Sequence, residues 1–191
     1  LTGSPVGVFS IFGTTAGDLT FSSSGNLDLN GNNITMADAP TALVLVETAD
    51  ARIINSNAST TAGNGYIGVT TAGDINDTEV CNGLGLTFTD LTGATGATVI
   101  RRFHRARSLT ANSGIERYYW VDPATATVLN STRFAYNESE LNGGPESLVL
   151  FDEATPTEAG TYVLVGDGTE AMVTGSDYLE NTASTYALGA G

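Results

Sequence analysis

The stretch from Thr98 to Leu150 decides the fold, and it reads TVIRRFHRARSLTANSGIERYYWVDPATATVLNSTRFAYNESELNGGPESLVL. Two runs in it, 99–106 and 115–121, alternate between residues of different character and flank a loop that contains Asn112 and Gly114. Alternating runs around a short Gly-containing loop are typical of a β-hairpin. The sequence therefore predicts a pair of antiparallel strands at the centre of the chain.

Outward from this stretch, helical spacing is nearly absent and short alternating runs recur between Gly, Asn and Asp residues. The chain has 191 residues, of which 23 are Gly. This pattern predicts an all-β fold, a β-sandwich or jelly roll of many short strands with essentially no helix. Two organisations fit: a single β domain over 1–191, or an N-terminal β segment over 1–92, made of hairpins or solenoid-like, before a β-sandwich module over 98–191.

The N-terminal part contains the run NLDLNGNNITM from Asn26 to Met36. Its Asn30-Gly31 dipeptide lies between alternating apolar residues and predicts a hairpin. The alternative is two rungs of a parallel β-solenoid, in which Asn-Gly also occurs at corners. Further along, 42–46 is continuously apolar and predicts a strand that is buried on both faces.

The charge balance excludes several classes of partner. The chain has 21 acidic and 7 basic residues, a net charge of −14, and every basic residue is Arg. Such a surface repels nucleic acid and anionic membranes, and the longest apolar run, 42–46, is too short for membrane insertion. An acidic surface fits an extracellular protein, a salt-rich habitat or the binding of divalent cations. The single Cys excludes an internal disulfide framework.

Six of the seven Arg residues lie in the central stretch. Strand alternation places Arg102 and His104 on one face, and Arg117 and Tyr119 likewise share a face of the partner strand. A buried guanidinium requires a carboxylate partner, and several Glu residues are close in sequence. The sequence therefore predicts an internal Arg–carboxylate brace formed by Arg102, Arg117, Glu116, Glu138, Glu140 and Glu146.

The alternative for this surface is ligand binding, with Tyr118 and Trp120 as a stacking platform for a sugar. No catalytic residues are predicted. His104 is the only His and has no Cys at ligand spacing, which argues against zinc. Glu138 and Glu140 have an easier role as partners of the Arg residues than as a glycosidase pair.

One acidic segment resembles the start of a calcium-binding loop. It contains Asp74, Asn76 and Asp77 but lacks the Gly of an EF-hand at the sixth position. A looser calcium site at these three residues remains a candidate, and no other metal or cofactor is expected.

The central stretch resembles a β-sandwich module that recurs in large exported surface proteins of Bacteroidota. The resemblance is carried by the successive motifs IRRFHRA, SGIERYYWVDPA, LNSTRFAYNESELNG and ESLVLF, with STYALG at 184–189 similar to the last strand of that module. The matching positions are Arg117, Tyr118, Tyr119, Pro123, Tyr136, Glu140, Leu141, Asn142, Gly143 and Glu146. The second half of the chain matches well and the first half loosely, and the absence of Lys is a departure from the pattern.

The resemblance implies a non-enzymatic β module of an adhesin or repeat protein exported by the type IX secretion system, extracellular or at the cell surface with its signal peptide removed. The expected function is therefore that of a structural subunit or repeat of a surface fibre, filament or adhesin; the alternative is a carbohydrate-binding module, with calcium or without it. The expected partners are copies of the chain or adjacent domains of the same surface protein, and surface glycans. Terminal segments require a partner to be ordered, which predicts assembly through Val6, Val8, Phe9, Ile11, Tyr186 and Leu188.

Overall fold

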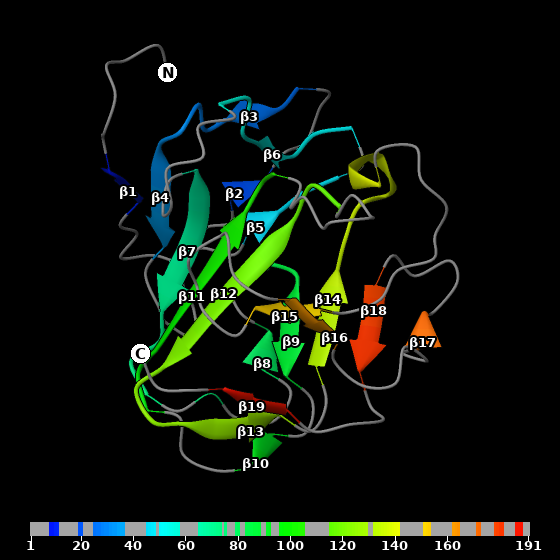
Figure 1. The fold of residues 1–191 in the computed structure, drawn as a ribbon. Helices are drawn as coiled ribbons and strands as arrows, with labels where there is room; N and C mark the ends of the chain where they lie inside the picture. Colours follow the sequence, from blue (N-terminus) through cyan, green and yellow to red (C-terminus); the bar gives the residue numbers. More distant parts are fainter. Residues whose placement is uncertain are drawn as a thin grey trace.

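The chain is all-β in the computed structural model (Figure 1). The structure describes residues 8–11, 19–20, 25–36, 45–48, 50–57, 65–73, 75, 79–80, 83–88, 91–92, 96–105, 115–129, 132–141, 151–153, 162–164, 171–172, 178–181 and 186–188. Within these ranges the helical structure is limited to a single 3₁₀ turn, η1 (Glu138–Glu140). The prediction of an all-β, sandwich-like fold of many short strands is confirmed at this level.

The N-terminal part winds through three sets of parallel strands, two of which form separate two-stranded sheets and one of which belongs to a five-stranded sheet. The first pass is β1 (Val8–Ile11), β2 (Leu19–Thr20) and β3 (Leu27–Asp28), and we call it the first coil. The second coil is β4 (Asn33–Met36), β5 (Leu45–Val46) and β6 (Ile53–Ile54). Each strand pairs in parallel with its counterpart one coil later, and β4 pairs in the same way with β7 (Tyr66–Thr70). The arrangement is that of a short β-solenoid.

The hairpin expected at Asn30-Gly31 is therefore wrong, and the parallel alternative describes the segment. Both residues have positive φ, 46° and 80°, and the N–H of Asn32 donates to the carbonyl of Leu29. This turn rotates the chain into the next sheet and does not fold β4 back onto β3. Of the strand expected over 42–46, residues 42–44 lie outside the described residues and Leu45–Val46 form β5; burial on both faces does not hold for Val46, which is 39% exposed.

Polar side chains join one coil to the next at the corners. The amide oxygen of Asn33 accepts the N–H groups of Gly65 and Tyr66, and that of Asn26 accepts the N–H of Arg52. In the other direction, the N–H of Gly31 donates to the side chain of Asn55. Asn side chains here satisfy backbone groups that a turn leaves without a partner.

The central hairpin extends the parallel sheet. β11 (Thr98–Phe103) pairs antiparallel with β7 and with β12 (Tyr118–Pro123), which gives the strand order β1-β4-β7-β11-β12. Arg102 lies opposite Tyr119, and Arg101 lies opposite Trp120. The predicted antiparallel pair is thus present, and its sheet continues into the solenoid, as Figure 1 shows.

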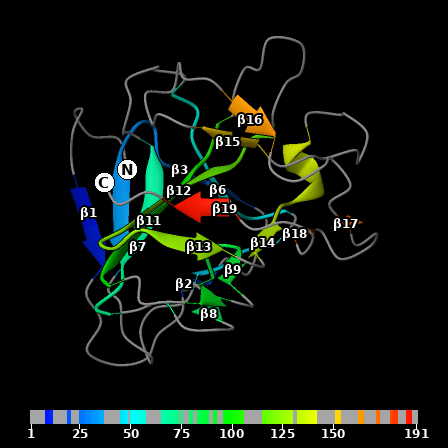
Figure 2. The same ribbon diagram turned by 60° about the horizontal axis from the view of Figure 1, so that its bottom comes forward.

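A second layer packs across the core. It contains β8 (Glu79–Val80), β9 (Leu86–Phe88), β14 (Thr132–Ala135), β17 (Ala171–Met172) and β18 (Tyr178–Asn181) in the order β17-β18-β14-β9-β8. A three-stranded sheet of β10 (Leu91–Thr92), β13 (Thr127–Leu129) and β19 (Tyr186–Leu188) lies below it in Figure 1, and Figure 2 brings this sheet forward. β15 (Phe151–Glu153) and β16 (Tyr162–Leu164) form a separate antiparallel pair.

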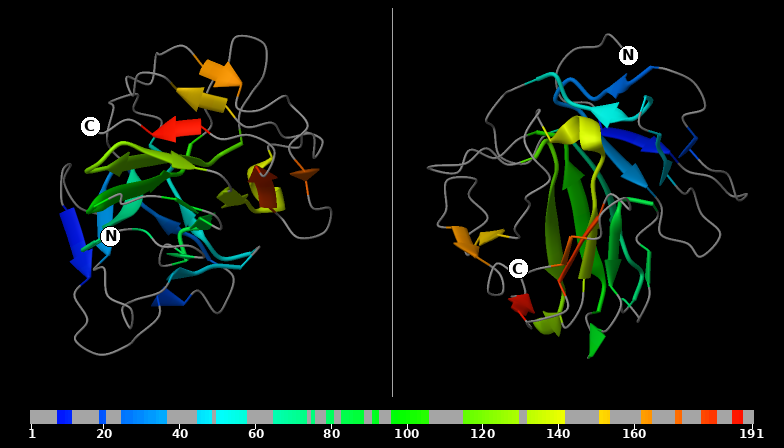
Figure 3. Two further views of the ribbon diagram at one scale, coloured as in Figure 1. Left: turned by 90° about the horizontal axis from the view of Figure 1, so that it is seen from below. Right: turned by 90° about the vertical axis from the view of Figure 1, so that its right-hand side faces the viewer.

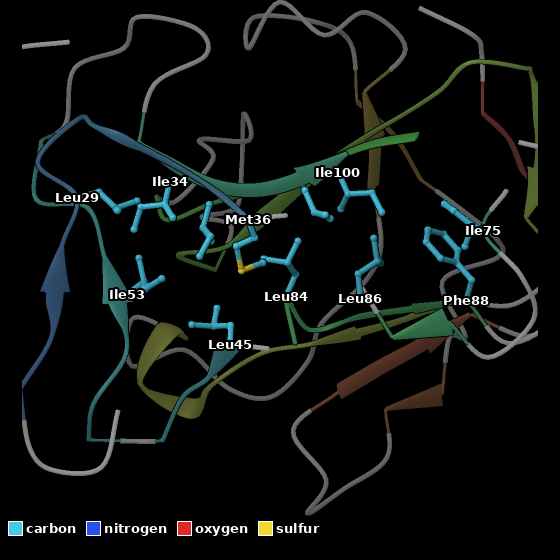
Figure 4. Packing of buried hydrophobic residues seen from close by; sticks show 12 residues of the cluster. Leu29, Ile34, Met36, Leu45, Ile53, Ile75, Leu84, Leu86, Phe88 and Ile100 are labelled. Atoms are coloured by element: carbon cyan, nitrogen blue, oxygen red, sulfur yellow. The ribbon is translucent and has the colours of Figure 1, made fainter. Parts of the chain in front are cut away.

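One apolar core runs through both parts of the chain. Figure 4 shows it as a continuous row of side chains from Leu29 near one end to Phe88 at the other. Met36 of the solenoid and Ile100 of the central hairpin belong to the same cluster. The two views of Figure 3 show the strand layers that enclose this core. No helix in the part of the chain that is described has the length and apolar character needed to cross a membrane.

Candidate functional site

Arg102 is a cation in the core. It lies on the inner face of β11, and its side chain is 0% exposed. Its Nη1 donates to the carbonyl of Leu84 at 3.0 Å, and its Nη2 lies 2.8 Å from Oε2 of Glu47. Burial, followed by repulsion from Arg117, lowers the pKa of Arg102, while the Glu47 carboxylate opposes this effect. An ion in the interior is tolerated only with such a partner.

Arg117 is the second buried cation, and it is bound by Glu140. Its Nε and Nη2 donate to the same carboxylate oxygen at 3.2 and 2.8 Å, and Nη1 donates to the carbonyl of Ala135. The side chains are 6% and 1% exposed. Burial alone would lower the pKa of Arg117, but Tyr119 and the carboxylates of Glu140 and Glu47 outweigh it and raise the pKa.

Glu47 connects the two pairs. Its Oε2 lies 2.8 Å from Arg102 and 3.8 Å from Arg117, and its Oε1 accepts the N–H of Ile53 in the second coil. The four side chains of Glu47, Arg102, Arg117 and Glu140 form a charge-neutral group that we call the buried quartet. It ties the solenoid to the central hairpin and to the turn η1.

Gly85 and Tyr119 complete the wall of the quartet. The hydroxyl of Tyr119 donates to the carbonyl of Leu84 at 2.8 Å, and burial raises its pKa. Gly85 has φ +85°, and a Cβ there would lie 2.7 Å from this hydroxyl and 2.9 Å from Nη1 of Arg117. Only Gly fits both the backbone conformation and the space.

His104 directly follows β11, contacts Arg102 and is a structural residue. It is 4% exposed, and its Nε2 accepts the Nε–H of Arg102 at 3.2 Å. Burial, and then the charges of Arg102, Arg117 and Arg52, hold the pKa of His104 well below its usual value. A neutral ring whose Nε2 already accepts a hydrogen bond is poorly placed to act as a general base.

The turn η1 is held against the second coil by its own polar contacts. The side chain of Asn137 donates to the carbonyl of Thr48, and a guanidinium nitrogen of Arg52 donates to the hydroxyl of Ser139. The other oxygen of Glu140 accepts the N–H of Asn137 at 2.9 Å. This contact holds the Glu140 side chain in the orientation that Arg117 binds, which reduces the conformational entropy lost in forming the pair.

The structure places the residues of the predicted brace as follows. It brings Arg102, Arg117 and Glu140 together. Glu116 contributes its N–H, which donates to the carbonyl of Glu140, and forms no ion pair in the described part of the chain. Glu138 belongs to η1, and Glu146 lies outside the described residues.

Glu47 was missed because the prediction considered only acids close in sequence to the Arg residues. It directly follows the apolar run 42–46, and an acid beside buried apolar residues is itself a sign of an internal ion pair.

The outer face of the hairpin carries aromatic rings together with Arg101 and Arg105. The guanidinium of Arg101 lies 5.1 Å from the ring of Tyr66 and 5.3 Å from that of Trp120. The rings of Phe103 and Tyr118 stack with their centroids 4.6 Å apart. Tyr118 and Trp120 are half-buried, so the two predicted stacking residues retain exposed surface.

A hollow of about 190 Å³ opens between β6 and the end of β11. It is lined by Arg52, Ile53, Ile54, Asn55, His104, Arg105, Glu116 and Glu140. Its ionisable groups are already engaged in part: His104 and Glu140 belong to the brace, and Arg105 donates to the hydroxyl of Tyr118 at 2.9 Å. The hollow therefore lies directly behind the brace. His104 and Glu140 are bound to Arg residues and are not free to act there as an acid–base pair.

The other predicted residues fall in different places. The calcium candidates Asp74, Asn76 and Asp77 lie outside the described residues, as does Val6, whereas Val8, Phe9 and Ile11 form β1 and Tyr186 and Leu188 belong to β19. Among the residues that are described, no three His, Cys, Asp or Glu side chains gather in a way that suits a metal ion.

In comparisons with known proteins, no family model, no curated protein and no solved structure matches the chain.

Proposed function

We propose that the chain is a non-enzymatic structural protein of the extracellular space or cell surface, a subunit or repeat of a fibre, filament or adhesin that assembles through its terminal strands. One observation carries the proposal: the first and the last described strands are both sheet edges. β1 ends the five-stranded order, and β19 ends the order β10-β13-β19. An edge strand offers unpaired backbone groups to another chain.

The buried quartet supports a structural role. Its two Arg and two Glu side chains bind one another and join the solenoid, the central hairpin and η1. His104 and Tyr119 are hydrogen-bonded in the same group. Buried polar groups that bind one another rigidify a fold and leave few free groups for chemistry. The resemblance of the central stretch to modules of exported surface proteins supports the same conclusion.

The test is the assembly state of the protein. Electron microscopy of native material should show the chain within a fibre or a surface layer, with copies or adjacent domains contacting β1 or β19. Limited proteolysis of the purified chain should remove terminal residues that the assembled form protects. A monodisperse monomer whose two ends both resist protease would contradict the proposal.

The second candidate is carbohydrate binding on the outer face of the hairpin. It is favoured by the exposed surface of Tyr118 and Trp120 beside Arg101 and Arg105, since aromatic faces stack on sugar rings and guanidinium groups bind carboxylates. A glycan array should show binding that Trp120→Ala abolishes and Trp120→Phe largely keeps. Equal binding by Trp120→Ala would exclude this platform.

The calcium candidate is tested separately. If Asp74, Asn76 and Asp77 bind calcium, millimolar Ca²⁺ should raise the melting temperature of the chain, and Asp74→Asn combined with Asp77→Asn should remove that increase.

A further inference from the structure

We infer that the outer face of the central hairpin binds a uronic acid residue of a glycan, and that Arg101 recognises its carboxylate. The inference rests on the carbohydrate-binding candidate and deepens it, because it names the class of sugar and the residue that selects it. It is carried by the contacts of Arg101, by the groups beside it and by the charge of the chain.

Arg101 lies between two aromatic rings. It is on β11, which has β7 on one side and β12 on the other (Figure 1). The guanidinium carbon of Arg101 is 5.1 Å from the ring centroid of Tyr66 on β7 and 5.3 Å from that of Trp120 on β12. All three side chains are half-buried. The rings therefore hold the guanidinium in place while part of the side chain remains exposed.

Gly68 provides the space in which Arg101 lies. It is the register partner of Arg101 on β7. A Cβ at Gly68 would be 3.2 Å from Cγ of Arg101, so the stem of Arg101 passes close over this residue. The lack of a side chain at Gly68 thus lets the stem lie against the sheet, with the guanidinium beside both rings.

The guanidinium of Arg101 keeps its hydrogen-bonding capacity. With the described part of the chain it forms no hydrogen bond and no ion pair, whereas Arg105 and Arg117 both donate to oxygen atoms. Aromatic rings interact with the flat face of a guanidinium, and its five N–H donors point outward in its plane. A ligand carboxylate can accept two of these donors at once. Because the rings already restrict the side chain, binding costs little further conformational entropy.

Asp122 places an acceptor on the same face. Strand alternation puts it on the side of Trp120, two residues further along β12, and two residues of a strand span about 6.7 Å. A cationic donor, an aromatic ring and a carboxylate acceptor therefore adjoin one another. A uronic acid offers the complement of each, with a carboxylate, an apolar C–H face and hydroxyl donors.

The charge of the chain distinguishes a uronic acid from other ligands. The net charge is −14, and a nucleic acid or a peptide rich in Asp and Glu would bring many more negative charges to it. One uronic acid in an otherwise neutral glycan brings a single charge, and its hydroxyl groups can donate to Asp122. A neutral sugar would displace water from Arg101 without supplying a charged acceptor, so it should bind more weakly.

A glycan array of matched pairs tests the inference. It carries oligosaccharides with one glucuronic or galacturonic acid residue, each beside its carboxyl-reduced counterpart, in which a hydroxymethyl group replaces the carboxylate. The wild-type chain should bind the acidic member of at least one pair about tenfold or more tightly than the reduced member, as expected for a charge-assisted hydrogen bond. Arg101→Gln should abolish this preference.

Arg133→Gln is the matched control. Arg133 is also a half-buried strand residue, and its guanidinium carbon lies 4.8 Å from the ring of Tyr178. The substitution therefore removes the same charge from similar surroundings, in a different sheet. It should leave the preference for the acidic member unchanged, and thermal unfolding checks that both variants fold.

Fluorescence of the wild-type chain gives a readout that needs no variant. Trp120 is the only Trp, so all of the indole emission comes from the outer face of the hairpin. Titration with the preferred acidic oligosaccharide at constant ionic strength should change this emission. The same concentration of the carboxyl-reduced counterpart should leave it unchanged.

The inference and the functions proposed above fail in different ways. Equal binding of both members of every pair, or a preference that Arg101→Gln keeps, would overturn uronate recognition by Arg101 and leave the carbohydrate-binding candidate standing. Tighter binding of an oligoglutamate peptide on the same array would overturn the inference in favour of an acidic protein partner. Absence of binding to every glycan would overturn both the inference and the carbohydrate-binding candidate, and would not touch the structural subunit, which electron microscopy tests.

Discussion

Replacing Glu140 by Gln is the most direct test of the buried quartet. Gln has nearly the same shape, and its carbonyl oxygen can still accept the hydrogen bonds from Arg117, whereas its NH2 group cannot accept the N–H of Asn137. It removes one negative charge from a side chain that is 1% exposed. The change therefore removes the charge and one acceptor while it keeps the packing.

The expected loss of stability is large because Arg117 stays buried. After the substitution its nearest carboxylate is that of Glu47 at 3.8 Å, which Arg102 already shares. Removing one partner of a buried pair typically costs about 3–5 kcal/mol. Gln keeps the hydrogen bonds from Arg117, and the N–H of Asn137 that loses its acceptor is only partly buried, so the expected value is near the lower limit, at about 3 kcal/mol. For a chain of this size that corresponds to a fall in melting temperature of about 6–12 °C.

Urea denaturation followed by circular dichroism gives the free energy of unfolding. Glu116→Gln is the matched control, because Glu116 is half-buried and forms no ion pair in the described part of the chain; it should change the free energy by less than about 0.5 kcal/mol. Arg117→Gln combined with Glu140→Gln should cost less than the sum of the single changes. A Glu140→Gln variant as stable as the control would refute the view that this charge is needed in the core.

Three further changes test other parts of the fold. His104→Gln should make the free energy of unfolding less dependent on pH on the acid side. Because the fold lowers the pKa of His104, the neutral ring contributes stability that is complete above pH 6.5 and is lost below it, by at most about 1.4 kcal/mol per pH unit. Urea denaturation from pH 7.5 to 5 measures this, and parallel profiles for variant and wild type would contradict it. Gly68→Ala should cost about 1–3 kcal/mol, because the new Cβ would lie 2.6 Å from the carbonyl oxygen of Ile100, whereas Gly73→Ala, with no atom within 4 Å, should be nearly neutral in the same assay. Asn33→Ala should cost about 1–3 kcal/mol of stability, because it leaves the N–H groups of Gly65 and Tyr66 without their acceptor. Asn30→Gly is the control and should not destabilise the chain, because Gly readily adopts the φ of 46° found there. Equal effects of the two changes would show that the corner contact is dispensable.

The central hairpin could be predicted because its information is local. Alternation placed Arg102 with His104 on one face of the first strand and Arg117 with Tyr119 on one face of the second. The pairing of Arg102 with Tyr119 brings these two faces to the same side of the sheet. The N-terminal turn could not be predicted in the same way. Asn30-Gly31 has the same left-handed residues in a hairpin and in a solenoid corner, and the choice between them depends on the distant strands β6 and β7.

The site shows the same limit. Glu140 follows Arg117 in the same stretch, and the need of a buried cation for a carboxylate was sufficient to name it among four candidate partners of the Arg residues. The partner of Arg102 is Glu47, which reaches it through the winding of the second coil. That path is set by tertiary structure and leaves no trace in residue spacing.

The quartet also bears on the order in which the chain can fold. Glu47 is synthesised long before Arg102 and Arg117, and Glu140 follows later still. The N-terminal coils can therefore form while the carboxylate of Glu47 is still hydrated. Docking of the central hairpin must then dehydrate all four charges together, because any three of them would leave an unpaired ion in the interior. We therefore expect the two parts of the chain to become ordered together, in a step slowed by the long separation of the partners in sequence.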